Sequence, residues 1–366
     1  MDLTAVRGEL PVLERFAYLN AGTNGPLPRR TAEAMRRALE RDLTEGRSSK
    51  PYFEGLLEGR ERLRVALAGV LRTAADNIAL ASSTTEGCNV VVAGLGIGPG
   101  DEVVTTDSEH PGLFGGLKAS GADLRVVPLK DLPAAEALGA LEDAVSGRTR
   151  LIALSHVSWL TGALFPVREL AGRGIPLLVD GAQAAGTIPV DVEELGCDFY
   201  TVSAQKWLLG PDVTGALYVA PSRLEELRMT FPSYGSWDWE APEEYTPNAT
   251  AARFDPGWIP LGSVEGLLES IAFAHEAGEE RFDHARAMAE RLRELLADRY
   301  EVVTEPGQAT LVTWKAEGPS EEVVARLADA GVVIRDLPGL GLLRASCGFW
   351  TSDEDLDRLL AALEES

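Results

Sequence analysis

The stretch LLVDGAQAAGTIPVDVEELGCDFYTVSAQKW, residues 177 to 207, decides the fold and indicates the kind of site that the chain carries. Asp180 ends one apolar strand-like run, and Lys206 follows the next. In open α/β folds the carboxyl ends of neighbouring strands meet at one sheet edge, where these folds bind ligands. The spacing therefore predicts a carboxylate and an amine side by side at that edge. Taken alone, the two residues leave an ordinary strand-end aspartate and a surface lysine as the simpler interpretation.

Pyridoxal phosphate is a cofactor that needs such a pair. A lysine forms the Schiff base with it, and an acid keeps its pyridine nitrogen protonated so that the ring can accept electrons. The chain has five lysines, and Lys206 alone lies between an apolar run and an aromatic residue. Desolvation at such a place lowers the pKa of the amine and favours the neutral form that this chemistry requires.

Seven short apolar runs separated by helix-like segments predict the main domain. Strands that alternate with helices are typical of a largely parallel sheet covered on both faces, so we expect an α/β fold with about seven strands. Helical periodicity precedes the runs over about residues 31 to 71. The seven runs are residues 77–82, 101–106, 123–129, 150–158, 175–180, 198–204 and 214–220.

A smaller α+β unit is predicted at the C-terminal end. It follows a long helical region at about 260 to 299. We expect a large domain over residues 15–258 and a small domain made of residues 1–14 and 259–366, which includes the linking helix. The predicted elements of the small unit are strand-like runs at 301–305, 309–316, 331–336 and 341–346 and helices at 319–329 and 352–364.

Composition excludes several classes of function. The 366 residues are 45% hydrophobic, and 34 basic against 57 acidic residues give a net charge of -23, which repels nucleic acid and anionic membranes. The N-terminus lacks a signal-peptide pattern and no run reaches the ~18 apolar residues of a membrane span, so we expect a cytoplasmic protein. The three cysteines and four histidines have neither disulfide nor metal-ligand spacing, so we expect no metal.

Ser83-Thr84-Thr85-Glu86-Gly87 follows one apolar run and opens a helix, a position that suits a phosphate group. The same residues also fit a plain N-cap, because Ser or Thr with a following Glu commonly starts a helix. Near the lysine, Ser203 and Gln205 offer further donors for a phosphate.

Two side chains could contact the ring of such a cofactor. His110 lies just past a strand-like run and directly before Pro111-Gly112, where an imidazole could lie flat against an aromatic ring. Gln183, close to Asp180, could donate to the phenolic oxygen. The alternatives are a satisfied polar residue in a loop for His110 and a capping residue for Gln183, and we expect a structural role for His156.

Arg335 and Arg344 lie in two C-terminal strand-like runs with eight residues between them. A guanidinium group binds a carboxylate through two parallel hydrogen bonds, so two arginines in one cleft would suit an amino-acid substrate. Surface positions beside acidic neighbours such as Asp336 are the alternative, and Arg344, with apolar neighbours, favours the functional role.

Taken in order, these segments resemble the class V aminotransferase branch of fold type I pyridoxal phosphate enzymes, which includes cysteine desulfurases and isopenicillin N epimerase-like proteins. The resemblance runs from YLNAGTNGPLP at residues 18–28 to FWTSDEDLDRLL at residues 349–360. It implies a homodimer with the site near the subunit interface. It also implies that Lys206 binds the cofactor covalently and that Asp180 faces the pyridine nitrogen. His110 would stack on the ring, and Gln183 would contact the phenolic oxygen. The residues implied around the phosphate are Thr84, Thr85, Ser203 and Gln205, and those implied on the substrate carboxylate are Arg335 and Arg344.

Within that branch the sequence is most similar to the cystine and cysteine C–S lyases. SHVSWLTGAL places Trp159 where desulfurases have an asparagine, as those lyases do. Two positions depart from the pattern. Gln205 replaces a usual histidine, which implies weaker phosphate binding, and Trp258 stands where desulfurases use a threonine from the neighbouring subunit. That departure leaves the intersubunit contact open, while the family resemblance still implies the homodimer.

The chemistry separates a lyase from a desulfurase. A desulfurase needs a nucleophilic cysteine on a mobile loop, whereas DLPGLGLL between Arg335 and Arg344 has none, and Cys347 lies inside a strand-like run. We therefore expect a β-elimination on cystine, cysteine or a related sulfur amino acid that gives pyruvate, ammonia and a thiol or persulfide. An aminotransferase or epimerase acting on another amino acid, a desulfurase and a non-catalytic binding protein are the alternatives.

Overall fold

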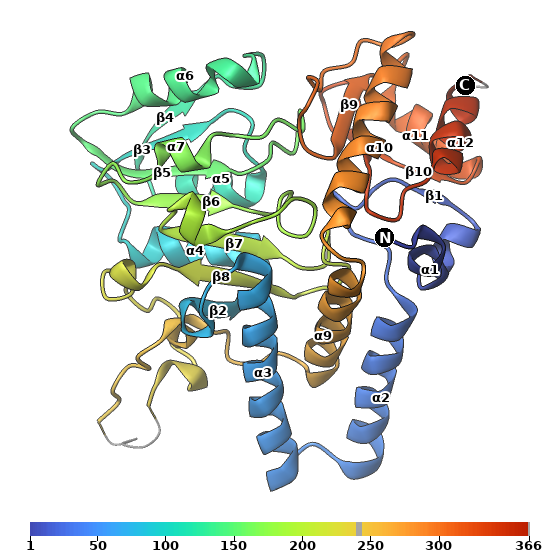
Figure 1. Ribbon diagram of the computed structural model, residues 1–366. Coiled ribbons are helices and arrows are strands. Elements are labelled where there is room, and N and C mark those ends of the chain that lie inside the picture. The colour runs from blue at the N-terminus through green and yellow to red at the C-terminus, as the bar shows by residue number, and fades with distance from the viewer. Residues whose placement is uncertain (239–243, 365–366) are drawn as a thin grey trace.

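A seven-stranded sheet forms the centre of the larger part of the molecule (Figure 1). The computed structural model describes residues 1–238 and 244–364. All neighbouring strands pair in parallel except β8, which runs antiparallel to both of its neighbours. The predicted mainly parallel sheet is confirmed, and each of the seven apolar runs forms a strand. In spatial order these are β2 (Ile78–Ala81), β8 (Gly215–Val219), β7 (Phe199–Ser203), β6 (Leu177–Asp180), β5 (Thr149–Ser155), β3 (Glu102–Thr106) and β4 (Asp123–Val127).

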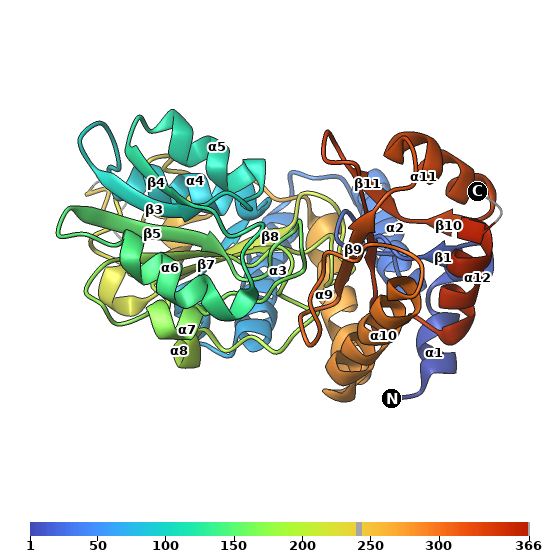
Figure 2. The same ribbon diagram turned by 90° about the horizontal axis from the view of Figure 1, so that it is seen from above.

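Both faces of this sheet are covered, which is why its strands are almost entirely buried, except for the edge strand β4. Side chains alternate between the faces along each strand. On β6, Leu178 packs in the cluster that α4 and α5 complete, whereas Val179 packs in the larger cluster on the opposite face. Figure 2 shows α4 and α5 on one side of the sheet and α6, α7 and α8 on the other. These helices are α4 (Thr84–Gly94), α5 (Pro111–Ala119), α6 (Ala137–Ala144), α7 (Val167–Leu170) and α8 (Val192–Leu195).

Long helices connect the sheet to the C-terminal part (Figure 1). The helix α9 packs against both α2 and α3. The helical region predicted at 260 to 299 is two helices rather than one, because Gly278 adopts φ 74 in the left-handed region and ends the first. The long helices are α2 (Arg29–Glu45), α3 (Lys50–Leu71), α9 (Leu261–Glu276) and α10 (Glu280–Ala297).

The C-terminal part has its own three-stranded antiparallel sheet, in the order β11, β12, β9. Its core cluster also contains Ala17 and Leu19, because β1 pairs in parallel with β10. The run predicted at 301–305 is not a strand; it makes one isolated bridge, between Val302 and Trp314. The division into domains at 14/15 and 258/259 stays a prediction. The elements are β1 (Ala17–Tyr18), β9 (Leu311–Lys315), α11 (Ser320–Asp329), β10 (Val332–Val333), β11 (Arg335–Leu337), β12 (Leu342–Ser346) and α12 (Asp353–Glu364), with α1 (Leu3–Gly8) at the N-terminus.

A buried carboxylate, Asp255, fastens α3 to the edge of the sheet. Its oxygens accept from Arg60 Nη2 at 2.8 Å and from Arg64 Nη1 and Nη2 at 3.1 and 2.8 Å. The amide of Leu80 on β2 donates to the same carboxylate at 2.8 Å. Because all of these groups are buried, the carboxylate and the two guanidinium groups depend on one another for their charge balance.

Two searches of the described residues bear on function. None of the helices within 1–238 and 244–364 combines the length and the apolar character that crossing a bilayer requires. The same part of the chain holds no group of three or more His, Cys, Asp or Glu side chains placed to bind a metal ion.

Candidate active site

Asp180 and Lys206 both lie at the carboxyl edge of the central sheet. Asp180 is the last residue of β6, and Lys206 follows the end of β7 by three residues. The Asp180 side chain is buried and Oδ1 accepts from the amide of Ala182 at 2.9 Å. Burial raises the pKa of Asp180, while the amide of Ala182 and the charge of Lys206 oppose that rise. Burial lowers the pKa of Lys206 to about 8, against the opposing charge of Asp180.

The first turn of α4 lies against the end of β7. Ser203 Oγ accepts from the amide of Thr84 at 3.0 Å and donates to Thr84 Oγ1 at 3.2 Å. Ser83 is the N-cap of α4, with its hydroxyl oxygen accepting from the amide of Glu86, so the capping interpretation is confirmed for that residue. Thr84 and Ser203 are thus brought together at a helix N-terminus, a place that favours an anion.

His110 begins α5 as its N-cap. Its Nδ1 accepts from the amide of Gly112 at 3.0 Å, which places the proton of the neutral ring on Nε2. Burial, followed by the charges of Lys206, Arg335 and Arg344, lowers the pKa of His110 to about 4. The ring is therefore neutral at physiological pH, and these charges place it in the same site as the lysine.

The indole of Trp159 and the hydroxyl of Thr85 also lie near His110 or its turn. The indole of Trp159 meets the imidazole edge to face, with ring centroids 5.4 Å apart. A Cβ added at Gly112 would lie 2.3 Å from Thr85 Oγ1, so a glycine is needed there to let the Thr85 hydroxyl approach the His110 turn.

Gln183 has a fixed amide orientation. Its Nε2 donates to the carbonyl of Gly22 at 2.9 Å, and its Oε1 accepts from Trp207 Nε1 at 3.0 Å. Gln183 lies in the turn that follows β6 rather than in a helix. One hydrogen on Nε2 remains to donate to a ligand, since the amide carries two.

Arg335 and Arg344 face one another across the β11–β12 pair. Arg344 is fully buried; its Nη1 donates to the carbonyl of Trp159 at 2.9 Å, while its Nε and Nη2 have no partner within the described residues. Burial, together with the charge of Arg335, lowers the pKa of Arg344 to about 9. Arg335 Nε donates to the carbonyl of Asp336 at 3.0 Å, and its Nη1 donates to the hydroxyl of Thr23 at 3.3 Å.

An unpaired buried guanidinium indicates a missing anion. Leaving such a group unpaired costs several kcal/mol, roughly, unless a ligand completes its hydrogen bonds. Gly22 keeps the space open, because a Cβ there would lie 2.6 Å from Arg344 Nη2. The indole Nε1 of Trp159, whose carbonyl binds Arg344, is also buried without a partner among the described residues.

Gln205 directly precedes Lys206. Its Oε1 is buried without a partner, and within the described residues no hydrogen bond joins its side chain to Thr84, Thr85 or Ser203. It lines a cavity of about 600 Å³ beside Tyr18 and Asn24. The place of Gln205 around the phosphate stays a prediction.

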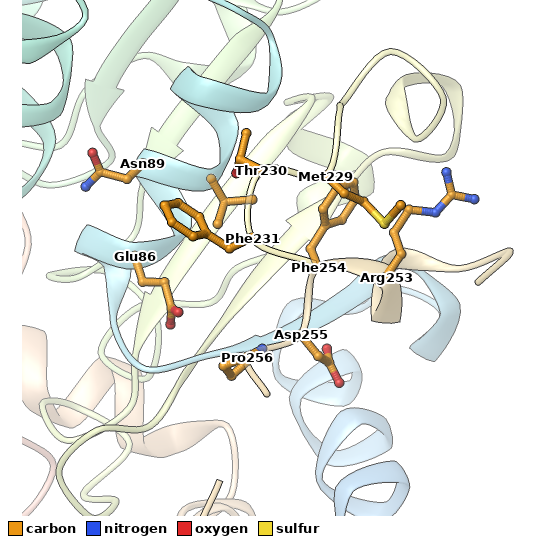
Figure 3. Close-up of a pocket in the computed structure, with 10 residues that line it drawn as sticks. Glu86, Asn89, Met229, Thr230, Phe231, Arg253, Phe254, Asp255 and Pro256 are labelled. Carbon is orange, nitrogen blue, oxygen red and sulfur yellow. The ribbon is translucent and has the colours of Figure 1, made fainter. Parts of the chain in front are cut away.

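Another cavity, of about 220 Å³, lies on the outer side of α4 (Figure 3). Glu86 and Asn89 of α4 line it together with Met229, Phe231 and Phe254. None of the predicted site residues lines this cavity, so its position does not support a role in the chemistry at the sheet edge.

Two residues of the site were not found by sequence reasoning. Gly22 supplies both the carbonyl for Gln183 and the space beside Arg344. Glu109 is a buried acid directly before His110. Its position beside that histidine, just after a strand-like run, was the one feature of the sequence that could have indicated it.

The donor set fits pyridoxal phosphate. It combines a buried amine of lowered pKa, a neighbouring carboxylate, a helix N-terminus with hydroxyl groups and a buried guanidinium with open hydrogen-bond positions. Together with the sheet topology, this set defines a pyridoxal phosphate enzyme of fold type I. The chain belongs to the aminotransferase class-V family, whose family model matches residues 17–359.

Relatives and solved structures agree with this assignment. The chain is 32% identical to isopenicillin N epimerase of Streptomyces clavuligerus over 404 residues, which cover 99% of this chain and 98% of that protein. It is 28% identical to a probable cysteine desulfurase of Methanothermobacter thermautotrophicus, over 98% of this chain and 97% of that protein.

Two solved structures are of one similar protein. The cystine C–S lyase C-DES in complex with its reaction product cysteine persulfide has a TM-score of 0.91 at 28% identity, over 97% of this chain and 98% of that one. A C-DES variant with glycine covalently linked to the PLP cofactor has a TM-score of 0.90 at 28% identity, over 98% of each chain. The protein is thus a pyridoxal phosphate-dependent enzyme similar to cysteine desulfurases and C–S lyases.

Proposed function

We propose that this enzyme is a C–S lyase that acts on cystine, cysteine or a related sulfur amino acid. Cystine plus water would give pyruvate, ammonia and cysteine persulfide, and cysteine plus water would give pyruvate, ammonia and hydrogen sulfide. The similarity to the cystine C–S lyase C-DES supports the reaction class.

The β11–β12 hairpin is the feature that favours a lyase over a desulfurase. Its strands are joined by residues 338–341, a turn in which Gly339 and Gly341 adopt left-handed φ values of 76 and 63. This turn is short and has no cysteine, so it cannot present the mobile thiolate that a desulfurase needs.

The cysteines elsewhere are poor nucleophiles. Cys88, Cys197 and Cys347 are all buried. Burial raises the pKa of Cys197 to about 12 and raises that of Cys347 further. A buried thiol of raised pKa carries little thiolate at neutral pH, and accepting sulfur from a substrate requires the thiolate.

Each residue of the site has a proposed role. When bound, the cofactor supplies an electron sink for the pair left at Cα. Lys206 Nζ, with a pKa of about 8, is partly neutral near that pH and takes the proton from the substrate Cα. Arg344 binds the substrate carboxylate through Nε and Nη2, the two atoms that lack partners, and Arg335 adds a second positive charge beside it.

The remaining roles concern the cofactor. Asp180 holds the proton of the pyridine nitrogen by charge. The neutral His110 provides a flat face for the ring, and the free Nε2 hydrogen of Gln183 donates to the phenolic oxygen. Thr84 and Thr85 donate to the phosphate through their hydroxyl groups, and Ser203 donates once its hydroxyl hydrogen turns away from Thr84 Oγ1. The contribution of Gln205 to that phosphate stays a prediction.

The reaction can be tested with the purified holoenzyme and, in separate assays, cystine and cysteine. Pyruvate is measured with lactate dehydrogenase and alanine by amino-acid analysis, because elimination yields pyruvate whereas desulfuration yields alanine. We expect pyruvate, at the same rate in the Cys347→Ala variant. Alanine in place of pyruvate, or no product from any sulfur amino acid, would contradict the proposal.

A second candidate is an epimerase, which the 32% identity to isopenicillin N epimerase favours. An epimerase exchanges the Cα proton without releasing ammonia. Incubating the enzyme with single amino acids in D₂O separates the two, since deuterium at Cα with loss of optical activity and no pyruvate identifies the epimerase.

We also propose a cytoplasmic homodimer with the site near the subunit interface. Trp258 and Phe53 are 56% and 44% exposed and contact each other edge to face, with centroids 6.3 Å apart. Exposed aromatic side chains of this size are typical of interfaces. Light scattering should give twice the mass of one chain, and Trp258→Glu should lower it; a monomeric parent protein would contradict the dimer.

A further inference from the structure

A second buried carboxylate lies beside the site and has no role in the reaction proposed above. Glu109 precedes His110, is 7% exposed, and connects the ends of two strands. Its Oε1 accepts from Thr106 Oγ1, on β3, at 2.6 Å. Its Oε2 accepts from the amide and the hydroxyl of Ser155, the last residue of β5, at 2.9 and 2.6 Å.

These bonds hold the turn that carries His110. Thr106 Oγ1 accepts from the amide of Ser108 at 3.2 Å while it donates to Glu109. The turn between β3 and α5 is therefore fastened to β5 through a single carboxylate. Because His110 is the next residue and caps α5, the position of its ring depends on this attachment.

Glu109 also lies close to Asp180. Ser155, which Glu109 binds, is paired in register with Asp180 across β5 and β6. The two carboxylates thus occupy neighbouring strand ends. The charged and titratable groups around Glu109 are Asp180 from β6, Cys88 from α4, and His110 on its own turn.

We propose that Glu109 is a positioning residue of the active site, which fixes the His110 turn and adds a second negative charge beside Asp180. It touches neither substrate nor cofactor and acts through His110 and Asp180. Two negative charges at the sheet edge favour the protonated forms of basic groups there, including Lys206 and the ring nitrogen of a bound cofactor.

The surroundings allow Glu109 to carry or release a proton without movement of the turn. Burial raises its pKa to about 7, with a further rise from Asp180 and an opposing effect from the bonds to Ser155 and Thr106. When Glu109 is protonated on Oε1, it can donate to Thr106 Oγ1, whose own hydrogen can turn to Ser108 Oγ at 3.1 Å. The charge beside Asp180 can therefore change near neutral pH.

Two variants separate the charge from the attachment. In Glu109→Gln the charge is lost, while Oε1 can still accept from Ser155 and Nε2 can donate to a reoriented Thr106 hydroxyl. In Glu109→Ala both are lost. Glu102→Gln is the matched control, because Glu102 is likewise a buried glutamate with two hydroxyl partners but lies at the opposite end of β3, where it also pairs with Arg125 and Arg148.

The readouts are the pH titration of the bound cofactor's absorbance and the affinity of the apoprotein for pyridoxal phosphate. We expect Glu109→Gln to lower the titration midpoint by roughly 0.5 to 1 pH unit, about a 3- to 10-fold loss of proton affinity, with cofactor affinity within about 3-fold of the parent. We expect Glu109→Ala to lower cofactor affinity by about 10-fold or more. The control should leave the midpoint unchanged.

A Glu109→Gln protein with the parent midpoint would overturn the role of the charge, and a folded Glu109→Ala protein with parent cofactor affinity would overturn the role in positioning. If Glu109→Ala does not fold, the titration midpoint of Glu109→Gln still tests the role of the charge. Neither readout requires elimination activity, so a failure here is distinct from a failure of the lyase proposal, on whose site this inference rests.

Discussion

Arg344 donates through Nη1 to the main-chain oxygen of Trp159 over 2.9 Å, which joins the C-terminal sheet to the loop after β5 of the central sheet. The contact fixes a guanidinium group whose Nε and Nη2 stay buried and unpaired. Two N–H groups held in one plane match the geometry of a carboxylate. The small sheet therefore contributes an anion-binding group to a site whose other residues come from the large one.

Replacing Arg344 should weaken substrate binding strongly. Arg344→Lys keeps the positive charge but loses the planar pair of donors, so we expect KM for the amino-acid substrate to rise about 30-fold or more, equivalent to about 2 kcal/mol. Arg335→Lys is the matched control, because Arg335 already has partners in Thr23 and Asp336, and we expect a rise of about 3- to 10-fold. Steady-state kinetics on both variants measures the two KM values. A larger rise in KM for Arg335→Lys would mean that Arg335, not Arg344, is the main carboxylate-binding residue.

Uptake of the cofactor should depend on pH through Lys206. Burial lowers the pKa of its amine to about 8, and only the neutral amine attacks the cofactor aldehyde. The rate at which apoprotein forms the covalent cofactor bond should therefore rise with pH and level off above about 8, rather than above about 10 as for an ordinary lysine. Stopped-flow absorbance between pH 6.5 and 9.5 measures this rate, and a rate still rising steeply at pH 9.5 would show that the amine is not depressed.

The same experiment has a direct control. Lys206→Ala should bind pyridoxal phosphate without the covalent bond and should show no pH-dependent phase in this range. Its turnover should fall to the background level, because the other four lysines, all within the described residues, are exposed. A Lys206→Ala protein with appreciable activity would exclude Lys206 as the base.

The sequence predicts the sheet better than it predicts the site. All seven strands could be found because each is an apolar run ended by polar residues, and Asp180 and Lys206 follow from those ends. The contact of Arg344 with Trp159 joins residues 185 positions apart, and the bonds of Glu109 to Ser155 span 46. No local pattern encodes such pairs. The open space at Gly22 is likewise a property of the packed molecule.

Asp255 should be essential for stability although it has no proposed catalytic role. Asp255→Asn leaves Arg60 and Arg64 buried with one charge fewer to balance them, so we expect a loss of about 3 to 5 kcal/mol in the free energy of unfolding. Asp353→Asn is the control, since Asp353 pairs with Arg291 in an exposed position and should cost less than about 1 kcal/mol. Urea unfolding of the apoprotein compares them, and equal losses would contradict a structural role for the buried group.

The pH dependence of stability should reveal Glu109 in the apoprotein. An acid whose folded pKa is raised binds more protons in the folded than in the unfolded state between the two values, so its contribution to stability falls as pH rises through that interval. For Glu109 the interval runs from the ordinary 4.5 to about 7, and the shift corresponds to about 3 kcal/mol.

Two buried histidines oppose this change and must be removed from the comparison. Burial lowers the pKa of His156 to about 4, so the folded state binds fewer protons there and stability rises with pH between about 4 and 6.5. His110 acts in the same direction. The difference between Glu109→Gln and the parent cancels both histidines, and it should move in favour of the variant by about 3 kcal/mol between pH 4.5 and 7. Urea unfolding at each pH measures the difference, and a constant value across the interval would mean that Glu109 titrates in its ordinary range.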